Sequence, residues 1–90
     1  MSKTAVTVTI KNKDSFNAIL FSLKANGFRL FKATSENSGM CEAHIYESNN
    51  PYDIYYCTEK VGFLGLKEKF CFSYCETQYD KVEKILEETK

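Results

Sequence analysis

The chain has 90 residues, which is the size of one domain, residues 1–90. Twelve acidic and twelve basic side chains give zero formal net charge, which argues against a dedicated nucleic-acid or membrane-surface protein. The N-terminus lacks the apolar run of a signal peptide, and no stretch is long enough to span a membrane. We therefore expect a cytoplasmic protein whose four cysteines are reduced thiols.

The N-terminal third predicts a strand, a helix and a second strand. Thr4 to Ile10 alternates valine and isoleucine with alanine and threonine, as a half-buried strand does. A helix follows, N-capped by Asp14 or Ser15 and ended by a left-handed Gly27. Its apolar stripe consists of Phe16, Ile19, Leu20 and Leu23. Phe28 to Thr34 predicts the second strand, which a right-handed crossover would place beside the first and parallel to it.

The middle of the chain predicts an antiparallel meander of three strands between Met40 and Glu76. The first strand runs from Cys41 to Glu47, because its side chains alternate between apolar and polar. The second, from Tyr52 to Cys57, follows a turn that ends at Pro51, and the third runs from Phe70 to Cys75.

The two turns of this meander predict its register. If both hairpins are symmetric about their turns, the pairs are Ile45 with Ile54, Ala43 with Tyr56, Tyr56 with Phe72, Ile54 with Tyr74, and Cys57 with Cys71. Gly62 and Gly65 bracket the second turn. One face of the meander is then continuously apolar and forms the core, and a slip of one residue would invert a whole strand.

A final helix completes the fold. Thr77 is its predicted N-cap, and its apolar stripe is Tyr79, Val82, Ile85 and Leu86. The order β-α-β-β-β-β-α predicts an α+β two-layer sandwich, in which two helices pack on one face of a mixed, mostly antiparallel five-stranded sheet.

The other face of the meander is the predicted partner-binding surface. It carries tyrosine and cysteine where a solvated sheet would show lysine, glutamate and threonine. Patches of this kind are enriched at protein interfaces. The predicted contact residues are Glu42, His44, Tyr46, Asp53, Tyr55, Cys57, Cys71 and Cys75. The alternative is that the Ser35–Gly39 loop, expected to be polar and mobile, or a C-terminal segment folds over this face.

The same residues include cysteine and histidine, which bind metals and act in catalysis in other proteins. Cys71 and Cys75 on one strand lie roughly 13 Å apart, too far to share one zinc ion, so no metal or other cofactor is expected. His44 faces Tyr55 with Cys57 diagonal, but a flat sheet face offers no pocket or oxyanion donors, so no enzymatic activity is expected. Cys57 and Cys71 could form a disulfide under oxidation.

RNA binding is the alternative function. Lys69 to Tyr74, followed by a helix, resembles the aromatic strand of an RNA-recognition motif. The segment departs from that motif because Phe70 stands where the motif has glycine, and no strand follows the final helix.

The function predicted from the sequence is protein binding without catalysis. Homodimerisation through the tyrosine- and cysteine-rich face is a further expectation. Small size and a lysine-rich composition typical of AT-rich coding suggest a phage or mobile-element accessory protein that inhibits or modulates a host factor.

Overall fold

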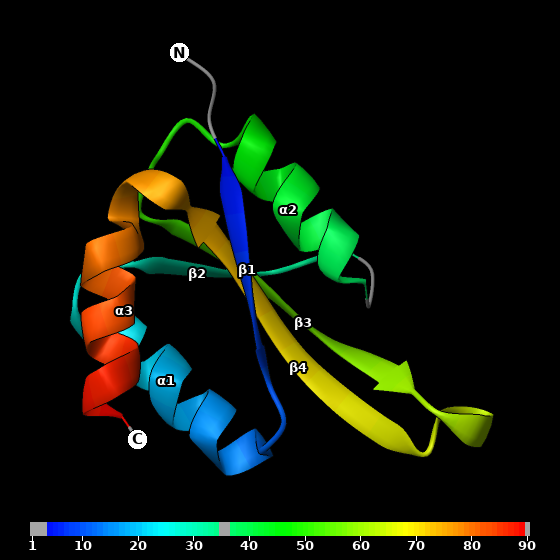
Figure 1. The fold of residues 1–90 in the computed structure, drawn as a ribbon. Helices are drawn as coiled ribbons and strands as arrows, with labels where there is room; N and C mark the ends of the chain where they lie inside the picture. Colours follow the sequence, from blue (N-terminus) through cyan, green and yellow to red (C-terminus); the bar gives the residue numbers. More distant parts are fainter. Residues whose placement is uncertain (1–3, 35–36, 90) are drawn as a thin grey trace.

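The computed structural model describes residues 4–34 and 37–89 (Figure 1). The elements follow in the order β1 (Ala5–Ile10), α1 (Lys13–Ala25), β2 (Arg29–Lys32), α2 (Ser38–Glu47), β3 (Asp53–Val61), η1 (Phe63–Gly65), β4 (Lys67–Cys75), η2 (Glu76–Gln78) and α3 (Tyr79–Glu88). The strands form one mixed sheet in the order β1-β4-β3-β2, in which only β2 and β3 are parallel neighbours. The predicted α+β class is confirmed, but four strands and three α-helices replace five strands and two helices.

The segment 41–47 is helical, so the predicted first strand of the meander is wrong. The Asn37 side chain caps α2 by accepting the Gly39 N–H at 2.7 Å. Cys41 and Ile45, four residues apart, are the buried residues of α2. The same spacing also fits strand alternation, because an even separation puts two residues on one face of a strand. The expected pairs of residues 43 and 45 with β3 are therefore absent from the sheet.

The predicted polar loop 35–39 is only partly a loop. Residues 35 and 36 lie outside the described residues, and α2 begins at Ser38. The backbone N–H of Ser38 donates to the Glu59 side chain on β3, which ties the start of α2 to the sheet.

The β3–β4 hairpin has the predicted register. Ile54 lies opposite Tyr74, Tyr56 opposite Phe72, and Cys57 opposite Cys71. Both bracketing glycines of the turn adopt positive φ, +83° at Gly62 and +64° at Gly65. The strands extend farther than predicted, to Val61 and from Lys67, which makes the hairpin the longest feature of the sheet.

The helix boundaries agree with the sequence in part. The predicted N-cap of α1, Asp14 or Ser15, is wrong. Asn12 caps this helix, because its side-chain oxygen accepts a 2.9 Å hydrogen bond from the Ser15 N–H. Gly27 follows the helix with φ +92°, as predicted. The expected N-cap of the last helix is wrong: Thr77 lies inside η2, and its hydroxyl donates to the Cys75 sulfur instead.

The two crossovers of the chain explain the positions of α1 and α2. Since β1, β3 and β2 all run in the same direction, β1 and β2 are parallel, but they lie at opposite edges and not side by side as predicted. The chain crosses from β1 to β2 over one face with α1, and returns from β2 to β3 over the other face with α2. The second crossover runs across the sheet in the opposite direction from the first and over the opposite face. The two crossovers therefore have the same handedness.

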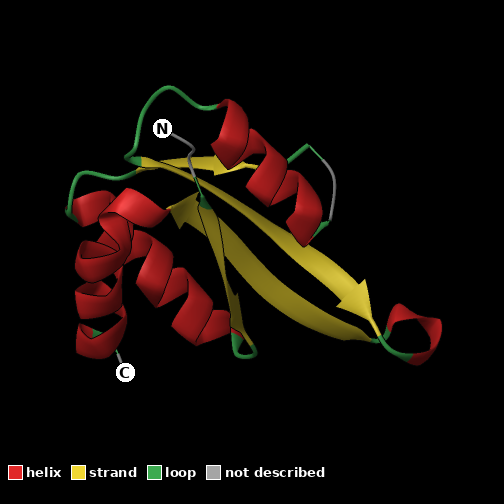
Figure 2. Cartoon of the chain, turned by 45° about the horizontal axis from the view of Figure 1, so that its top comes forward, coloured by secondary structure: helices red, strands yellow, loops and turns green. Residues whose placement is uncertain are grey.

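Both faces of the sheet are therefore covered, α1 and α3 on one and α2 on the other (Figure 2). The larger core lies under α1 and α3 and includes the buried residues Phe16, Ile19, Leu23, Phe28, Ile54, Phe70, Phe72, Tyr74, Val82 and Ile85. This confirms the predicted stripe of α1 and the predicted inner face of the hairpin. The predicted stripe of α3 is confirmed for Val82, Ile85 and Leu86 but is wrong for Tyr79, which is 48% exposed. The smaller core, under α2, consists of Ala33, Cys41, Cys57 and Cys71.

Candidate functional site

The predicted partner-binding residues are divided by α2 into buried and accessible groups. Cys57, Cys71 and Cys75 are buried, as is Asp53. Their predicted exposure is wrong, because α2 lies over the face that they occupy. Glu42, His44 and Tyr55 are half-buried and Tyr46 is exposed, but the first three have partners within the chain. The alternative of a covered face is closer to the structure, and the cover is α2, which includes Ser38 and Gly39 of the expected loop.

The thiols of Cys41, Cys57 and Cys71 form a buried cluster between α2 and the sheet. Burial is the largest cause that raises the pKa of Cys41 far above its ordinary value, followed by its hydrogen bond with Cys57. Burial also raises the pKa of Cys71. A thiol with a raised pKa is protonated at neutral pH and a poor nucleophile. No disulfide joins any of the four cysteines, all of which lie within the described residues.

His44, a predicted contact residue, belongs to a row of stacked planar groups that ends on β2. The His44 and Tyr55 rings are parallel within 16°, with centroids 4.5 Å apart. Phe31 stacks on Tyr55 at 5.2 Å, and the Arg29 guanidinium lies 5.1 Å from the centre of the Phe31 ring. Each planar group in the stack contacts the next one, and the stack packs α2 against the sheet.

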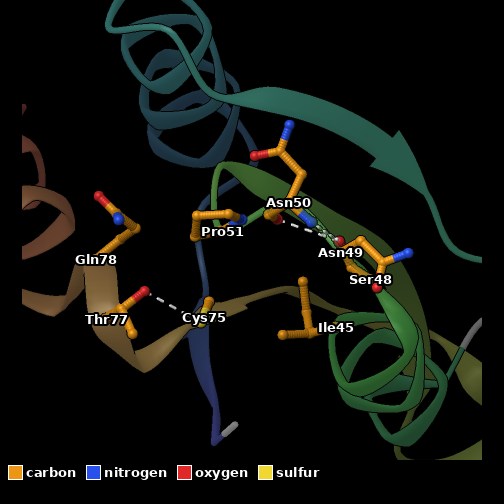
Figure 3. A pocket seen from close by; sticks show the side chains of 8 residues that line it. All are labelled: Ile45, Ser48, Asn49, Asn50, Pro51, Cys75, Thr77 and Gln78. Carbon is orange, nitrogen blue, oxygen red and sulfur yellow. Dashed lines mark hydrogen bonds between the residues drawn. The ribbon is translucent and has the colours of Figure 1, made fainter.

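The two predicted carboxylates are also committed to contacts within the chain. Glu42 accepts a 2.8 Å hydrogen bond from the Thr7 hydroxyl. Asp53 accepts a 2.6 Å bond from the Ser48 hydroxyl and lies 3.4 Å from the Arg29 guanidinium. Ser48 lines a recess of about 440 Å³ between the end of α2 and η2 (Figure 3). Its other lining residues include Pro51 and Cys75.

The aromatic strand considered for RNA binding faces the larger core. Phe70, Phe72 and Tyr74 are buried under α1 and α3, with exposures of 5% or less. Rings in this position cannot stack on bases, because stacking requires an open ring face. The expected use of these sheet aromatics is therefore wrong.

The most exposed apolar cluster lies elsewhere, at the end of the β3–β4 hairpin. Beyond the last residues paired with β1 and β2, the hairpin continues as a two-stranded arm, residues 59–69. Figure 1 shows this arm projecting away from all three helices. Its tip carries three large apolar side chains, Phe63, Leu64 and Leu66, which are 84%, 77% and 79% exposed. We call these three residues the apolar tip.

The arm below the tip is held by charged pairs. Glu59 lies opposite Lys69 and Lys60 opposite Glu68, and the Glu59 carboxylate is 3.6 Å from the Lys69 ammonium. Such cross-strand pairs each stabilise a hairpin by about 0.2–1 kcal/mol. The hydrogen bond from α2 to Glu59 braces the base of the arm. It also lowers the pKa of Glu59 and keeps the carboxylate ionised. The arm thus presents its tip on a supported stalk.

The sequence contained a partial signal for the tip. Gly62 and Gly65 indicated the turn, and the apolar letters between and after them are visible in the sequence. These side chains are exposed because β1 and β2 end before the arm does. The sequence of the arm alone does not indicate where those neighbouring strands end.

Two other kinds of site are absent from the described residues. No group of three or more histidine, cysteine, aspartate or glutamate side chains within residues 4–34 and 37–89 is placed to hold a metal ion. No helix in this part of the chain is both long and apolar enough to cross a membrane. Comparisons with protein-family models, with curated proteins and with solved structures found no match.

Proposed function

We propose that the chain is a small, non-enzymatic protein-binding module that contacts its partner through the apolar tip. The observation that carries the proposal is the exposure of Phe63, Leu64 and Leu66, each above three quarters, at the end of a projecting arm. Apolar side chains scattered singly are common on surfaces, but a contiguous group usually marks a contact.

The backbone of the tip supports the same proposal. Leu64 has φ +61° and ψ 17°, the left-handed region that glycine and asparagine adopt far more readily. A leucine there destabilises the folded chain by about 1–2 kcal/mol. Since its side chain is 77% exposed, packing within the chain does not offset this cost. Strain of this kind is concentrated at residues that contact ligands or partners.

The charges beside the tip indicate what the partner would offer. Lys60 and Lys67 are exposed and flank the tip on the two strands of the arm. An apolar recess with acidic groups on its rim would match both features. A tip that fills such a recess can block it, which supports the proposal of a cytoplasmic accessory protein that inhibits or modulates another factor.

The accessible remainder of the sequence-predicted surface gives a second contact area. Tyr46 is 52% exposed on α2, next to the half-buried Glu42 and His44. Contact through this area, or self-association into a homodimer, is a secondary form of the proposal. Light scattering over a range of concentrations measures the self-association directly.

The test uses a matched pair of phenylalanines. Phe63 in the tip is 84% exposed, and Phe21 on α1 is 76% exposed. Immobilised wild type, Phe63→Ser and Phe21→Ser are used to capture proteins from a lysate of the source organism. A specific partner should bind the wild type and Phe21→Ser, and bind Phe63→Ser at least about tenfold more weakly. A partner retained equally by all three would contradict the proposed contact.

A further inference from the structure

The edge of the sheet at β1 is an open strand edge. β1 is the outermost strand, and β4 is its sheet neighbour. The Glu76 N–H donates to the Thr4 carbonyl across this pair at 2.9 Å. Because opposed residues in an antiparallel pair exchange hydrogen bonds alternately, Val6, Val8 and Ile10 bond to β4. The N–H and C=O groups of the alternate residues Ala5, Thr7 and Thr9 therefore point outward.

The composition of β1 leaves this edge available for pairing. Natural edge strands are commonly protected by proline, lysine, a bulge or very short length. β1 has six residues, Ala-Val-Thr-Val-Thr-Ile, without proline or charge, and its register with β4 is uninterrupted. The opposite edge strand, β2, has only four residues and carries a charge at each end. The two edges thus differ, and only β1 resembles a docking edge.

An apolar groove of about 390 Å³ runs beside the open edge, between β1, α1 and α3. Its apolar lining is Val8 and Ile10 of β1, Ile19 of α1 and Leu86 of α3. The two β1 residues are only partly buried although they pack against the larger core. A strand added to β1 would place every second side chain on this face of the sheet, where it would fill the groove.

The charges of the groove select the occupant. Its charged lining residues are Glu83 and Glu87, both on α3. A second copy paired through β1 about a two-fold axis would bring its own two glutamates to the same face, gathering four carboxylates around the axis. A partner segment with lysine or arginine among its groove-facing residues would instead meet charges of opposite sign.

We propose that β1 accepts an extended segment of a partner protein as a fifth strand, with apolar and basic side chains alternating into the groove. This is strand addition to an exposed edge, in which backbone hydrogen bonds supply affinity and the groove supplies specificity. The surface is distinct from the apolar tip, since it involves β1, α1 and α3 and none of the residues of the arm.

The probe is a fluorescent heptapeptide, Thr-Val-Thr-Lys-Thr-Val-Thr, titrated with the full chain and followed by anisotropy. Its valines and lysine share one face of a strand and would enter the groove. Saturable binding is expected, weakening as salt is added, because the contact between lysine and the glutamates is partly exposed. The same peptide with glutamate in place of lysine should bind at least about tenfold more weakly.

A matched pair of variants tests the edge itself. Thr9→Pro removes an outward N–H, and Thr9→Val removes the same hydroxyl but keeps that N–H. Proline is tolerated at such edge positions, and far-UV circular dichroism checks the fold. Thr9→Pro should weaken peptide binding about tenfold or more, whereas Thr9→Val and Phe63→Ser should bind as the wild type does.

A measurement on the unaltered protein covers the case in which Thr9→Pro does not fold. N-methylation of one alternate set of peptide residues blocks the hydrogen bonds to β1, and methylation of the other set leaves them intact. One methylated peptide should lose binding and the other should keep it. No binding by the parent peptide, equal effects of the two methylation patterns, or a chain that dimerises through β1 would each overturn the proposal.

Discussion

Removal of the Tyr74 hydroxyl should stabilise the fold. The Tyr74 ring is fully buried between β1 and β3, opposite Val6 and Ile54. Its hydroxyl oxygen is buried, and no hydrogen-bond partner lies among the described residues. A buried hydroxyl without a partner destabilises the folded state by about 1–3 kcal/mol. Tyr74→Phe deletes that group and leaves only an oxygen-sized gap, so the free energy of unfolding should rise by about 1 kcal/mol.

The same substitution should change the alkaline stability. Burial raises the pKa of Tyr74 from its ordinary value of 10.0 to about 12, with a smaller contribution from the charge of Glu83. Above pH 10 the unfolded chain therefore loses this proton while the folded chain keeps it, and the free energy of unfolding decreases as the pH rises. The slope approaches about 1.4 kcal/mol per pH unit. Tyr74→Phe should remove this part of the slope.

Urea denaturation of wild type and Tyr74→Phe at pH 8, 10 and 11, followed by far-UV circular dichroism, measures both effects. A gain of 1 kcal/mol corresponds to an increase of about 4–8 °C in Tm for a domain of this size. Tyr46→Phe is the control, since that phenol is 52% exposed, and its substitution should change stability by less than about 0.5 kcal/mol. A destabilised Tyr74→Phe with an unchanged alkaline slope would refute the reasoning, because it would mean that the hydroxyl is hydrogen-bonded in the folded chain.

Three further substitutions test the cap, the arm and the tip. Asn12→Ala removes the acceptor of the Ser15 N–H and should reduce the free energy of unfolding by about 1 kcal/mol in urea denaturation. The pKa of Glu59 is lowered chiefly by the Ser38 backbone N–H, so its stabilising contribution is present above pH 4.5 and is lost as the pH falls through the folded pKa. Glu59→Gln should therefore reduce the loss of stability that occurs as the pH falls below 4.5 in the same assay. Leu64→Gly relieves the left-handed leucine and should raise Tm while weakening partner capture; a lower Tm would mean that the leucine is not strained.

The sequence predicted the larger core because its patterns there have a single interpretation. The stripe of α1 repeats at intervals that no strand would produce, and Gly62 and Gly65 fix the centre of the hairpin turn. Once the turn is fixed, counting along both strands is sufficient to pair Ile54 with Tyr74. These predictions depended on local turn chemistry and on periodicity, both of which the structure confirms.

The smaller core could not be predicted in the same way. Cys41 and Ile45 fit a strand face and also a helix face, and the apolar residues of α2 are spread around the helix and form no stripe. The Asn37 cap was the available sign of a helix, but Gly39 in the first turn weakened it. With α2 misassigned, Cys57 and Cys71 had no cover and were interpreted as an interface. Their small size instead lets a helix pack closely on the sheet.

The arrangement of covered and open surfaces follows from one topological fact. Crossovers over both faces cover the sheet with helices, so neither face remains to bind a macromolecule. Crossover helices cover the faces of a sheet but not its strand edges. In addition, the central strands β3 and β4 extend beyond β1 and β2 by the length of the arm. The fold therefore leaves two kinds of surface unsatisfied: an apolar tip carried beyond the core, and a row of outward backbone groups along β1. The apolar tip and the β1 edge both lie at the boundary of the sheet, so we expect the main partner contacts there and only a secondary contact at Tyr46 on α2.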